Sequence, residues 1–520
     1  MALSTKDTLF TEAEALKSAY ESVKAALSKS EERVALFEQE NEYLRELLVK
    51  FKKMNFGPRS EGWETKEQGK LVFNEAEVEA AKACEDEPAA NDEVEVKAHK
   101  KKRGHRRPLP KDLPREVVVI ELAPEARFDD LGNPLVVVGK EISEKLSYEP
   151  AKILVTEYHR LRYGIGAGEP VKTAPAVPSI IPKGIATASL LAAIVTAKYA
   201  DGLPLYRQEE MFLRQDVELS RTSMARWIVQ AAEAIRPIFN ILQDRLLESL
   251  YLACDETHVQ VLKEEGRRAQ SKSWMWVRTN PGAKEKIILF DYDPSRSGEV
   301  AKRLFEGYAG TLQCDGYGAY NAVEKNPGLI RIGCNMHGRR GFKEASEGSA
   351  KSKPLAEIAL KFYKALYAIE EEAREKALTA EKRYLLRLAK AKPIWDEFYA
   401  WAQAANEKVL KKSSIGAGLH YFLGEYDYLI GYLKDGSLEI DNGHVERMIR
   451  KFAIGRNNWL FSDTPQGAEA SAHFYSLVVT AKVNGVNPFE ALKQAFTEIP
   501  LCSALADFER LANLFTNTKI

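Results

Sequence analysis

Cysteine, long apolar runs and net charge are all scarce in this 520-residue chain. None of the five cysteines, at positions 84, 254, 314, 334 and 502, forms a Cys-x-x-Cys pair. This excludes a disulfide scaffold and favours a reducing compartment. The longest apolar run, Leu190–Ala197, is too short to span a membrane, and the first residues lack the apolar core of a signal peptide. We therefore expect a cytoplasmic protein without a membrane partner.

Net charge is zero because 75 basic and 75 acidic residues cancel, which argues against a uniformly basic nucleic-acid binder. The zero sum hides the separation of acidic and basic residues into different segments of the chain. Residues 84–96 hold six acidic residues and no basic one, whereas residues 97–115 hold nine basic residues and one acidic. Such a basic block is either a solvated linker or an arm that binds phosphates in a salt-dependent way. Its DNA-binding candidates are Lys100, Lys101, Lys102, Arg103, Arg106 and Arg107.

Residues 10–53 contain no proline and are rich in Glu, Lys, Ala and Leu. Residues recur there at seven-residue spacing in two series that are offset by three, as the a and d positions of a coiled coil are. The series are Leu16, Val23, Ser30, Phe37, Leu44 and Phe51, and Leu27, Val34, Asn41 and Leu48. Asn41 at an a position favours a dimer. A helix packed on its own domain is the alternative. We expect a coiled-coil helix over 1–61 and a charged linker over 62–115.

Short segments separated by Pro and Gly predict strands at Val117–Leu122, Leu135–Val138 and Ile153–Tyr158. These segments indicate a small β-rich module over residues 116–182.

The pattern then becomes helical, with predicted helices at Ser189–Tyr199, Leu205–Gln215 and Ser220–Ile235. Ser220 is a suitable N-cap for the third helix. The second and third helices, joined by a tight turn, fit a helix-turn-helix over residues 183–248 with Arg221 as a DNA contact. A small helical bundle would give the same pattern.

Strand-like segments dominate residues 249–345. They are Tyr251–Leu262, Ser273–Arg278, Lys286–Tyr292, Gly310–Cys314 and Leu329–Cys334, with a helix predicted at Ser297–Phe305. Three strands in succession, followed by helix-linked strands, predict a mixed sheet with helices on its faces.

Two acidic residues are notable for their positions in this predicted sheet. Asp255 interrupts the apolar first strand, and Asp315 follows the fourth. A carboxylate in a buried strand is costly unless it is paired or bound to metal, and two on neighbouring strands could share Mg²⁺. Glu446, within Asp441–Lys451, is the best candidate for a third ligand of a two-metal site. Taken alone, Glu446 with Arg450 is better explained as a surface ion pair.

Several motifs in order resemble the insertion sequence 66 family of DDE transposases. They are FGPRSE (56–61), RRPLPKDLPRE (106–116), AKYADGLPLYRQEEMF (197–212), LSRTSMARW (219–227), CDET (254–257), CDGYGAYN (314–321), GCNMHGRR (333–340) and the long segment from DNGHVER to EASA (441–472). The resemblance implies a multidomain α+β protein with a ribonuclease-H-like α/β core and the triad Asp255, Asp315 and Glu446. The core would occupy residues 249–345 and 431–485, interrupted by an all-helical insertion over 346–430 and followed by a helical region over 486–520.

The implied chemistry is metal-dependent cleavage of transposon-end DNA and its joining to target DNA. The triad would hold two Mg²⁺ ions, with Mn²⁺ as a substitute. The resemblance also implies a homodimer or higher oligomer, accessory proteins of the same element, and a bacterial, nucleoid-associated location. Further candidate DNA contacts are Arg339, Arg340, Arg447, Arg450, Lys451 and Arg456.

The chain departs from the family pattern at three places. The β-rich module lacks the cysteine pairs of the family's zinc motif, so we expect no zinc. Gly443 replaces the second Asn of the family's D-N-N-x-x-E-R pattern, and the family's C-W-A-H appears as Cys334-Asn335-Met336-His337. Cys334 and His337 resemble a C-x-x-H pair found near the active site of several DDE families, and either a structural role or a contact of the histidine with a DNA phosphate would explain them. The alternatives are a decayed transposase that only binds DNA specifically, and a ribonuclease-H-like nuclease that does not integrate.

Overall fold

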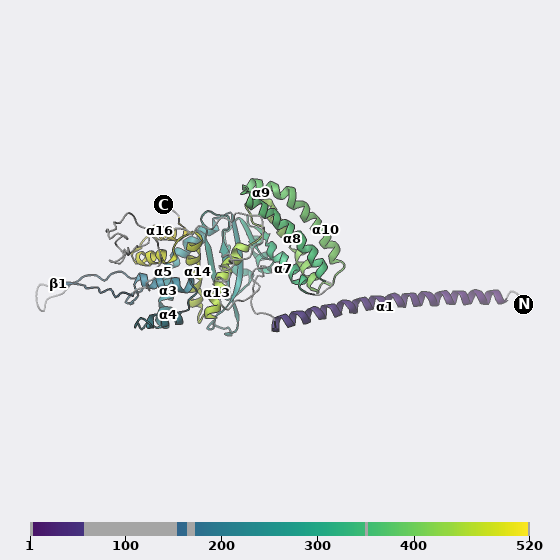
Figure 1. The fold of residues 1–520 in the computed structure, drawn as a ribbon, viewed down its shortest axis with the longest axis horizontal. Coiled ribbons are helices and arrows are strands. Elements are labelled where there is room, and N and C mark those ends of the chain that lie inside the picture. The colour runs from purple at the N-terminus through teal and green to yellow at the C-terminus, as the bar shows by residue number, and fades with distance from the viewer. Residues whose placement is uncertain (1–3, 57–152, 164–171, 349–351, 518–520) are drawn as a thin grey trace, which may run out of the picture. The chain divides into compact units, whose positions relative to one another are not determined.

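The computed structural model describes residues 4–56, 153–163, 172–348 and 352–517 (Figure 1). The chain divides into two compact units, Met1–Arg59 with Val177–Ile520, and Ser60–Ala176. In the described ranges, no helix is both long and apolar enough to cross a membrane. The acidic block, the basic arm and the first two predicted strands of the β-rich module lie outside these ranges.

The second unit has little regular structure in its described part. The predicted strand Ile153–Tyr158 is wrong, because these residues are exposed and form no strand ladder. Strand β1 (Arg162–Tyr163) instead pairs antiparallel with β2 (Lys172–Thr173). Arg160 adds two side-chain hydrogen bonds to the Ala174 carbonyl, at 2.8 and 2.6 Å. Pairing therefore starts later in the sequence than the apolar pattern indicates.

Helix α1 (Ser4–Phe56) forms where the low-Gly, Pro-free segment predicts a helix. The apolar members of its seven-residue series, where described, are exposed within the single chain. These are Leu16, Val23, Leu27, Val34, Phe37, Leu44, Leu48 and Phe51. The packing of this chain therefore does not bury the apolar seam.

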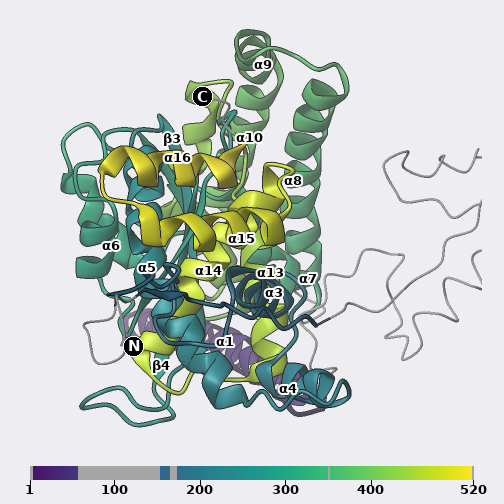
Figure 2. The same cartoon turned by 90° about the vertical axis from the view of Figure 1, so that its left-hand side faces the viewer.

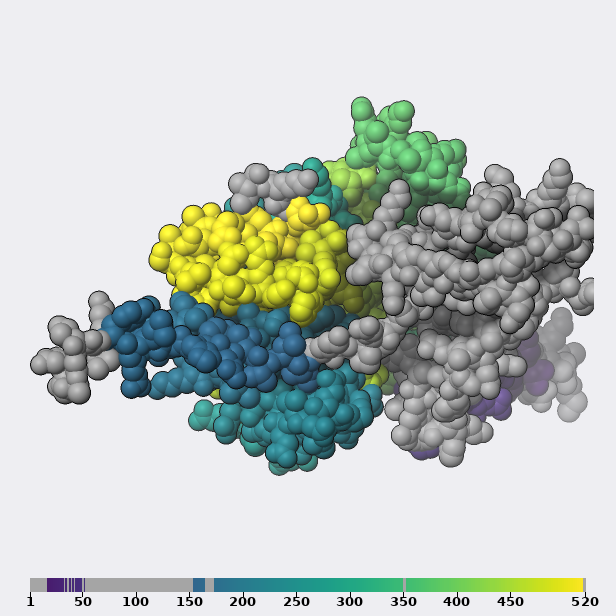
Figure 3. All heavy atoms as spheres, turned by 60° about the vertical axis from the view of Figure 1, so that its left-hand side comes forward, coloured from purple at the N-terminus to yellow at the C-terminus, as the bar shows by residue number. Residues whose placement is uncertain are grey.

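Three helices follow as predicted, α3 (Ala188–Tyr199), α4 (Leu205–Leu213) and α5 (Arg221–Leu247). Ser220 caps α5, accepting a hydrogen bond from the Ser223 amide. Helix α5 buries most of its apolar face against α14 (Pro465–Val483) and α16 (Leu505–Thr516), while α15 (Pro488–Glu498) packs on α3. Figures 2 and 3 show the C-terminal residues, in yellow, lying against the blue and teal segments that contain α3, α4 and α5. The C-terminal helices thus complete the core around α5.

The central sheet has the strand order β5-β4-β3-β6-β7. Its strands are β3 (Tyr251–Gln260), β4 (Lys272–Thr279), β5 (Ile288–Asp293), β6 (Thr311–Cys314) and β7 (Ile330–Gly333), with α6 (Gly298–Leu304) between β5 and β6. The first three strands are antiparallel, and β6 and β7 run parallel to β3. All five predicted strands and the predicted helix are confirmed.

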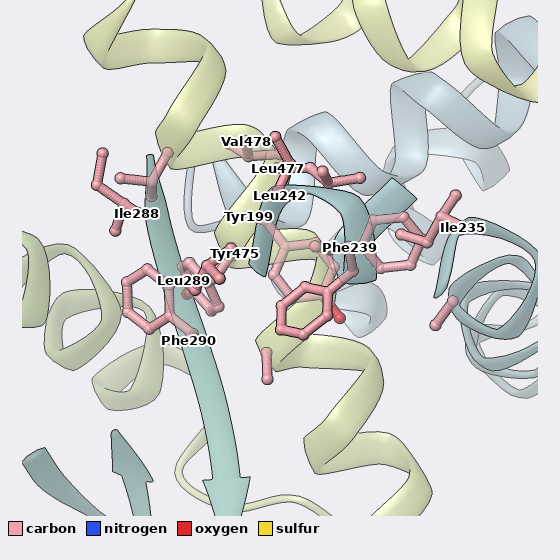
Figure 4. Packing of buried hydrophobic residues seen from close by; sticks show 14 of the residues in the cluster. Tyr199, Ile235, Phe239, Leu242, Ile288, Leu289, Phe290, Tyr475, Leu477 and Val478 are labelled. Carbon is pink, nitrogen blue, oxygen red and sulfur yellow. The ribbon is translucent and has the colours of Figure 1, made fainter. Parts of the chain in front are cut away.

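Strand β5 is an edge strand whose outer backbone groups are paired by helix α14. The hydroxyl of Thr480 both accepts from the Ile288 amide and donates to its carbonyl at 3.0 Å, and the Ser476 hydroxyl accepts from the Phe290 amide at 2.8 Å. Figure 4 shows Phe290 beside Tyr475, whose ring centroid lies 5.5 Å away. The unpaired edge that would invite another strand is therefore satisfied within the chain.

The predicted helical insertion, residues 346–430, is mostly helical in the structure. It runs through the end of α7 (Asn335–Ser346) and contains α8 (Ser352–Glu375), α9 (Ala380–Leu386), α10 (Lys392–Asn406), α11 (Ser414–Gly424) and α12 (Tyr426–Leu429). These helices bury a second core on the β7 side of the sheet, away from α5 and α14 (Figure 1). In this second core the buried guanidinium of Arg387 binds the Glu370 carboxylate of α8 at two 2.8 Å contacts.

Candidate functional site

Strands β3 and β6 bring two predicted site residues to the same end of the sheet. Their parallel register pairs Tyr251 with Thr311 and Ala253 with Gln313, always sixty residues apart. Asp255 and Asp315 are separated by the same sixty residues, so the register places them opposite each other as β6 ends. The carboxyl ends of parallel strands are where open α/β sheets bind ligands.

Asp255 has an environment that disfavours its charged form. Its residue exposure is only 9%, and one carboxylate oxygen accepts a hydrogen bond from the Glu256 amide at 2.8 Å. Burial, followed by repulsion from Glu256 and Asp315, raises the pKa of Asp255 well above its usual range. A bound divalent cation would reverse this penalty, as expected for a carboxylate placed to ligate metal.

His337, in the first turn of α7, completes a cluster with the two aspartates. One ligand atom from each of Asp255, Asp315 and His337 lies within 4.8 Å of the others. The His337 Nδ1 atom is buried and has no hydrogen-bond partner. Burial and then the positive charge of Arg340 lower the pKa of His337 to about 4. The imidazole is therefore neutral at physiological pH, the form that binds metal.

Glu446, the third predicted carboxylate, lies next to this cluster but is not part of it. It stands in the first turn of α13 (Gly443–Trp459), which packs on β3 and β4. Its Oε1 accepts a hydrogen bond from Arg340 at 3.1 Å and lies 3.9 Å from His337 Nε2. Burial raises the pKa of Glu446, although Arg340 opposes the shift. The structure thus brings Glu446 to the site with an arginine already on its carboxylate.

The donors present fit a divalent cation. Two carboxylates supply hard oxygen ligands, and a neutral imidazole with an unpartnered buried nitrogen supplies a third donor. Beside this cluster lies a cavity of about 870 Å³, which is lined by Asp315, His337 and Arg340. Two of the three clustered side chains, those of Asp315 and His337, therefore line an open cavity.

Cys334 fixes the site's geometry. Its thiol is fully buried, donates to the Asn442 side-chain oxygen at 2.8 Å and accepts from the Asn442 amide. Asn442 also reaches the Cys254 carbonyl of β3 at 3.5 Å. Asn442 stands at the N-cap of α13, but its side chain makes no capping bond. Cys334 and Asn442 instead tie the starts of α7 and α13 to strand β3.

Sequence reasoning missed a second charged group at the site, built around Glu256 and Arg296. Glu256 has a fully buried side chain that accepts from the Tyr320 hydroxyl at 2.6 Å and pairs with Arg296. The Cζ atom of Arg296 lies 3.7 Å from the Tyr317 ring centroid, and its Nη2 atom lies 3.8 Å from the Asp315 carboxylate. The adjacency of Glu256 to Asp255 was the one available signal, since the loop holding Arg296 has no recognisable pattern.

The predicted DNA-contacting residues are distributed unevenly. Arg447, Arg450 and Lys451 are exposed on α13, and Arg221 is exposed at the start of α5. Arg340 is half exposed and bound to Glu446, and Arg339 is half-buried. Arg456 is bound to β3, donating to the Thr257 hydroxyl at 3.2 Å and to the His258 carbonyl. Trp459 packs with Tyr199 and Tyr475, as a core residue does.

A mixed α+β fold with carboxylates gathered at one end of a five-stranded sheet is consistent with a DDE transposase domain. Residues 183–470, more than half of the chain, match the model of the Transposase IS66 family. The chain belongs to this family. Residues 43–118 match a second model, described as Transposase C of IS166 homeodomain.

Two relatives from Sinorhizobium fredii (strain NBRC 101917 / NGR234) align over most of their length. Protein y4qI is 30% identical over 493 residues, which cover 92% of this chain and 88% of the relative. Protein y4hP is 28% identical over 429 residues, which cover 78% and 77%. Both are named as uncharacterized proteins, so their names add no information about function.

Proposed function

We propose that this transposase cleaves transposon-end DNA and joins it to target DNA by metal-dependent phosphoryl transfer. The observation that carries the proposal is the β3–β6 register, which sets Asp255 beside Asp315 where the parallel strands end. The mixed sheet around them is, in this proposal, a ribonuclease-H-like core. The intact carboxylates speak against a decayed copy that only binds DNA.

Asp255, Asp315 and Glu446 would hold Mg²⁺ or Mn²⁺, which when bound activates an attacking hydroxyl and stabilises the leaving oxygen. The chain's own residues supply the remaining functions. Arg447, Arg450 and Lys451 project from α13 into solvent and would bind DNA phosphates. Asp255 is buried, which limits contact of its carboxylate with bulk water.

Replacing Asp255 with Asn tests this assignment. We expect D255N to lose Mg²⁺-dependent cleavage of DNA carrying the element's ends while retaining DNA affinity, because the amide keeps the shape but ligates metal poorly. Cleavage is followed on gels and affinity by fluorescence anisotropy. Asp463→Asn is the matched control, because the Asp463 carboxylate is exposed and pairs with the exposed Lys263. Equal loss of cleavage and binding in D255N would contradict the metal-ligand role.

We also propose that the transposase acts as a homodimer or higher oligomer assembled through α1. The support is the exposed apolar seam of α1, because eight seven-spaced apolar side chains remain accessible in the single chain. Pairing with another copy would bury them. Sedimentation of the full chain and of a Leu27→Lys, Leu48→Lys variant measures this, and an unchanged mass in the variant would contradict the seam.

A further inference from the structure

We propose, on the basis of the phosphoryl-transfer chemistry above, that His337 is a direct metal ligand alongside Asp255 and Asp315. The first metal site then consists of two carboxylate oxygens and one imidazole nitrogen. Glu446 stands outside this set in the metal-free arrangement, held by Arg340. His337 is a binding residue of the site and not only part of its scaffold.

Proximity is the first support. The three ligand atoms lie within 4.8 Å of one another, although they come from β3, the end of β6 and the first turn of α7. First-row metal ions bind imidazole nitrogen at about 2.0–2.1 Å and carboxylate oxygen at similar distances. Ligand atoms spread around one such ion stand at most about twice that distance apart. The cluster therefore closes on one ion with small side-chain movements.

Rigidity of the α7 start is the second support. Asn335, two residues before His337, is fully buried, and its side-chain amide donates to the Leu429 carbonyl at 2.9 Å and the Ile440 carbonyl at 3.0 Å. Cys334 is tied to Asn442. These bonds fix the first turn of α7, so the imidazole stays beside the carboxylates instead of moving into solvent.

The unmet bonding of His337 is the third support. Its Nδ1 is buried without a partner, and its Nε2 stands 3.9 Å from Glu446, beyond hydrogen-bond distance. A buried polar atom without a partner is costly in a folded protein. An imidazole that only braced the fold would be expected to hydrogen-bond through its nitrogens. Coordination of a metal ion would account for an imidazole nitrogen that has no hydrogen-bond partner.

The donor set also has a consequence for metal preference. Mg²⁺ binds oxygen ligands almost exclusively, whereas Mn²⁺, a transition-metal ion, accepts an imidazole nitrogen more readily. We therefore expect His337→Gln to weaken Mn²⁺ binding several-fold while changing Mg²⁺ binding less. The ratio of the two affinities, obtained by competition titration without DNA, isolates the nitrogen ligand from general damage to the site.

Pulsed electron paramagnetic resonance of Mn²⁺ bound to the full chain tests the ligand directly. We expect ¹⁴N modulation from a coordinated imidazole in the wild type, its loss in His337→Gln, and its retention in His420→Gln, a control at an exposed position of α11. Circular dichroism and melting curves establish that each variant folds. No ¹⁴N signal in bound wild type, or a signal that survives in His337→Gln, overturns the inference.

The two proposals fail separately. Because Mn²⁺ alone is the probe, a protein that shows the His337 signal but does not cleave DNA refutes the proposed function and leaves the ligand assignment standing. Conversely, a protein that cleaves DNA but shows no ¹⁴N signal refutes the ligand assignment and leaves the proposed function standing.

Discussion

Replacing Glu370 with Gln should loosen the helical insertion selectively. The Arg387 side chain is 0% exposed and uses all five N–H donors, two on Glu370 and three on the carbonyls of Tyr432, Asp435 and Leu438. Glu370 is 1% exposed and also binds Arg383. An amide at this position leaves the buried guanidinium without its counter-charge.

Removing one partner of a buried ion pair costs roughly 3–5 kcal/mol. We take the lower end, about 3 kcal/mol, because Gln retains the shape and can accept one hydrogen bond. That free energy corresponds to roughly a hundredfold increase in local opening, at about 1.4 kcal/mol per tenfold change. Hydrogen exchange measured by mass spectrometry should show this increase in peptides from α8 and α10 but not from α14.

The matched control is Glu372→Gln, two residues along the same helix. Its pairs with Lys376 and Lys390 are solvent-screened, and we expect no measurable change in exchange. Similar effects of E370Q and E372Q, or protection of α10 that is unchanged in E370Q, would refute the reasoning that burial decides the magnitude.

The same pair has a defined pH dependence. Burial alone would raise the pKa of Glu370, but Arg387 and Arg383 outweigh it and lower the pKa below its ordinary value. A carboxylate with a lowered folded pKa contributes its full stability above its unfolded pKa of about 4.3, and loses it as the pH falls through the folded value. The difference between wild type and E370Q should therefore be constant near neutrality and shrink only in acid.

Two further outcomes test other parts of the chain. If the basic arm binds DNA, changing Lys100–Arg103 to Gln should reduce the magnitude of the slope of log affinity against log salt concentration. The expected reduction is about three to four, because each phosphate contact contributes about 0.9. An unchanged slope would indicate that the segment is a linker that does not bind DNA. Gly455→Ala should lower the melting temperature through a loss of roughly 1–3 kcal/mol, because a methyl group there would lie 2.1 Å from the Tyr475 hydroxyl and 2.4 Å from Trp459. Gly424→Ala, which meets nothing within 4 Å, should change stability little, and an equal loss in both variants would contradict the steric explanation.

The sheet and its two aspartates could be predicted because their signals are local. Alternating strands, a buried acid at Asp255 and another after β6 are visible in the sequence, and the sixty-residue spacing matches the register. The resemblance indicates that the Cys334–His337 pair lies near the active site, but the local sequence does not predict that His337 lies beside the two aspartates. Its position depends on bonds from Asn335 to carbonyls 94 and 105 residues away, which no local pattern encodes.

Errors arose where local pattern and tertiary context disagree. Ile153–Tyr158 has the residue types of a strand, but a strand requires a partner, and in the described residues pairing begins only at Arg162. The role of Glu256 was missed because nothing in the sequence near Glu256 indicates which arginine pairs with it. Arg296 reaches it from a loop forty residues later.

The covered edges of the sheet limit how copies of this protein can assemble. Hydroxyls of α14 pair the β5 edge, and at the opposite edge Leu429 and Gly431 lie against Gly333 and Ile332 of β7. At the β5 edge, the backbone groups of Ile288 and Phe290 are therefore already paired by α14 and are not available to a strand of a second molecule. If copies of the protein assemble through α1, as proposed above, the distance between their two sites would depend on helix length and not on strand spacing. Lengthening α1 by whole heptads would then change the reach between paired DNA ends without disturbing the chemistry at either one.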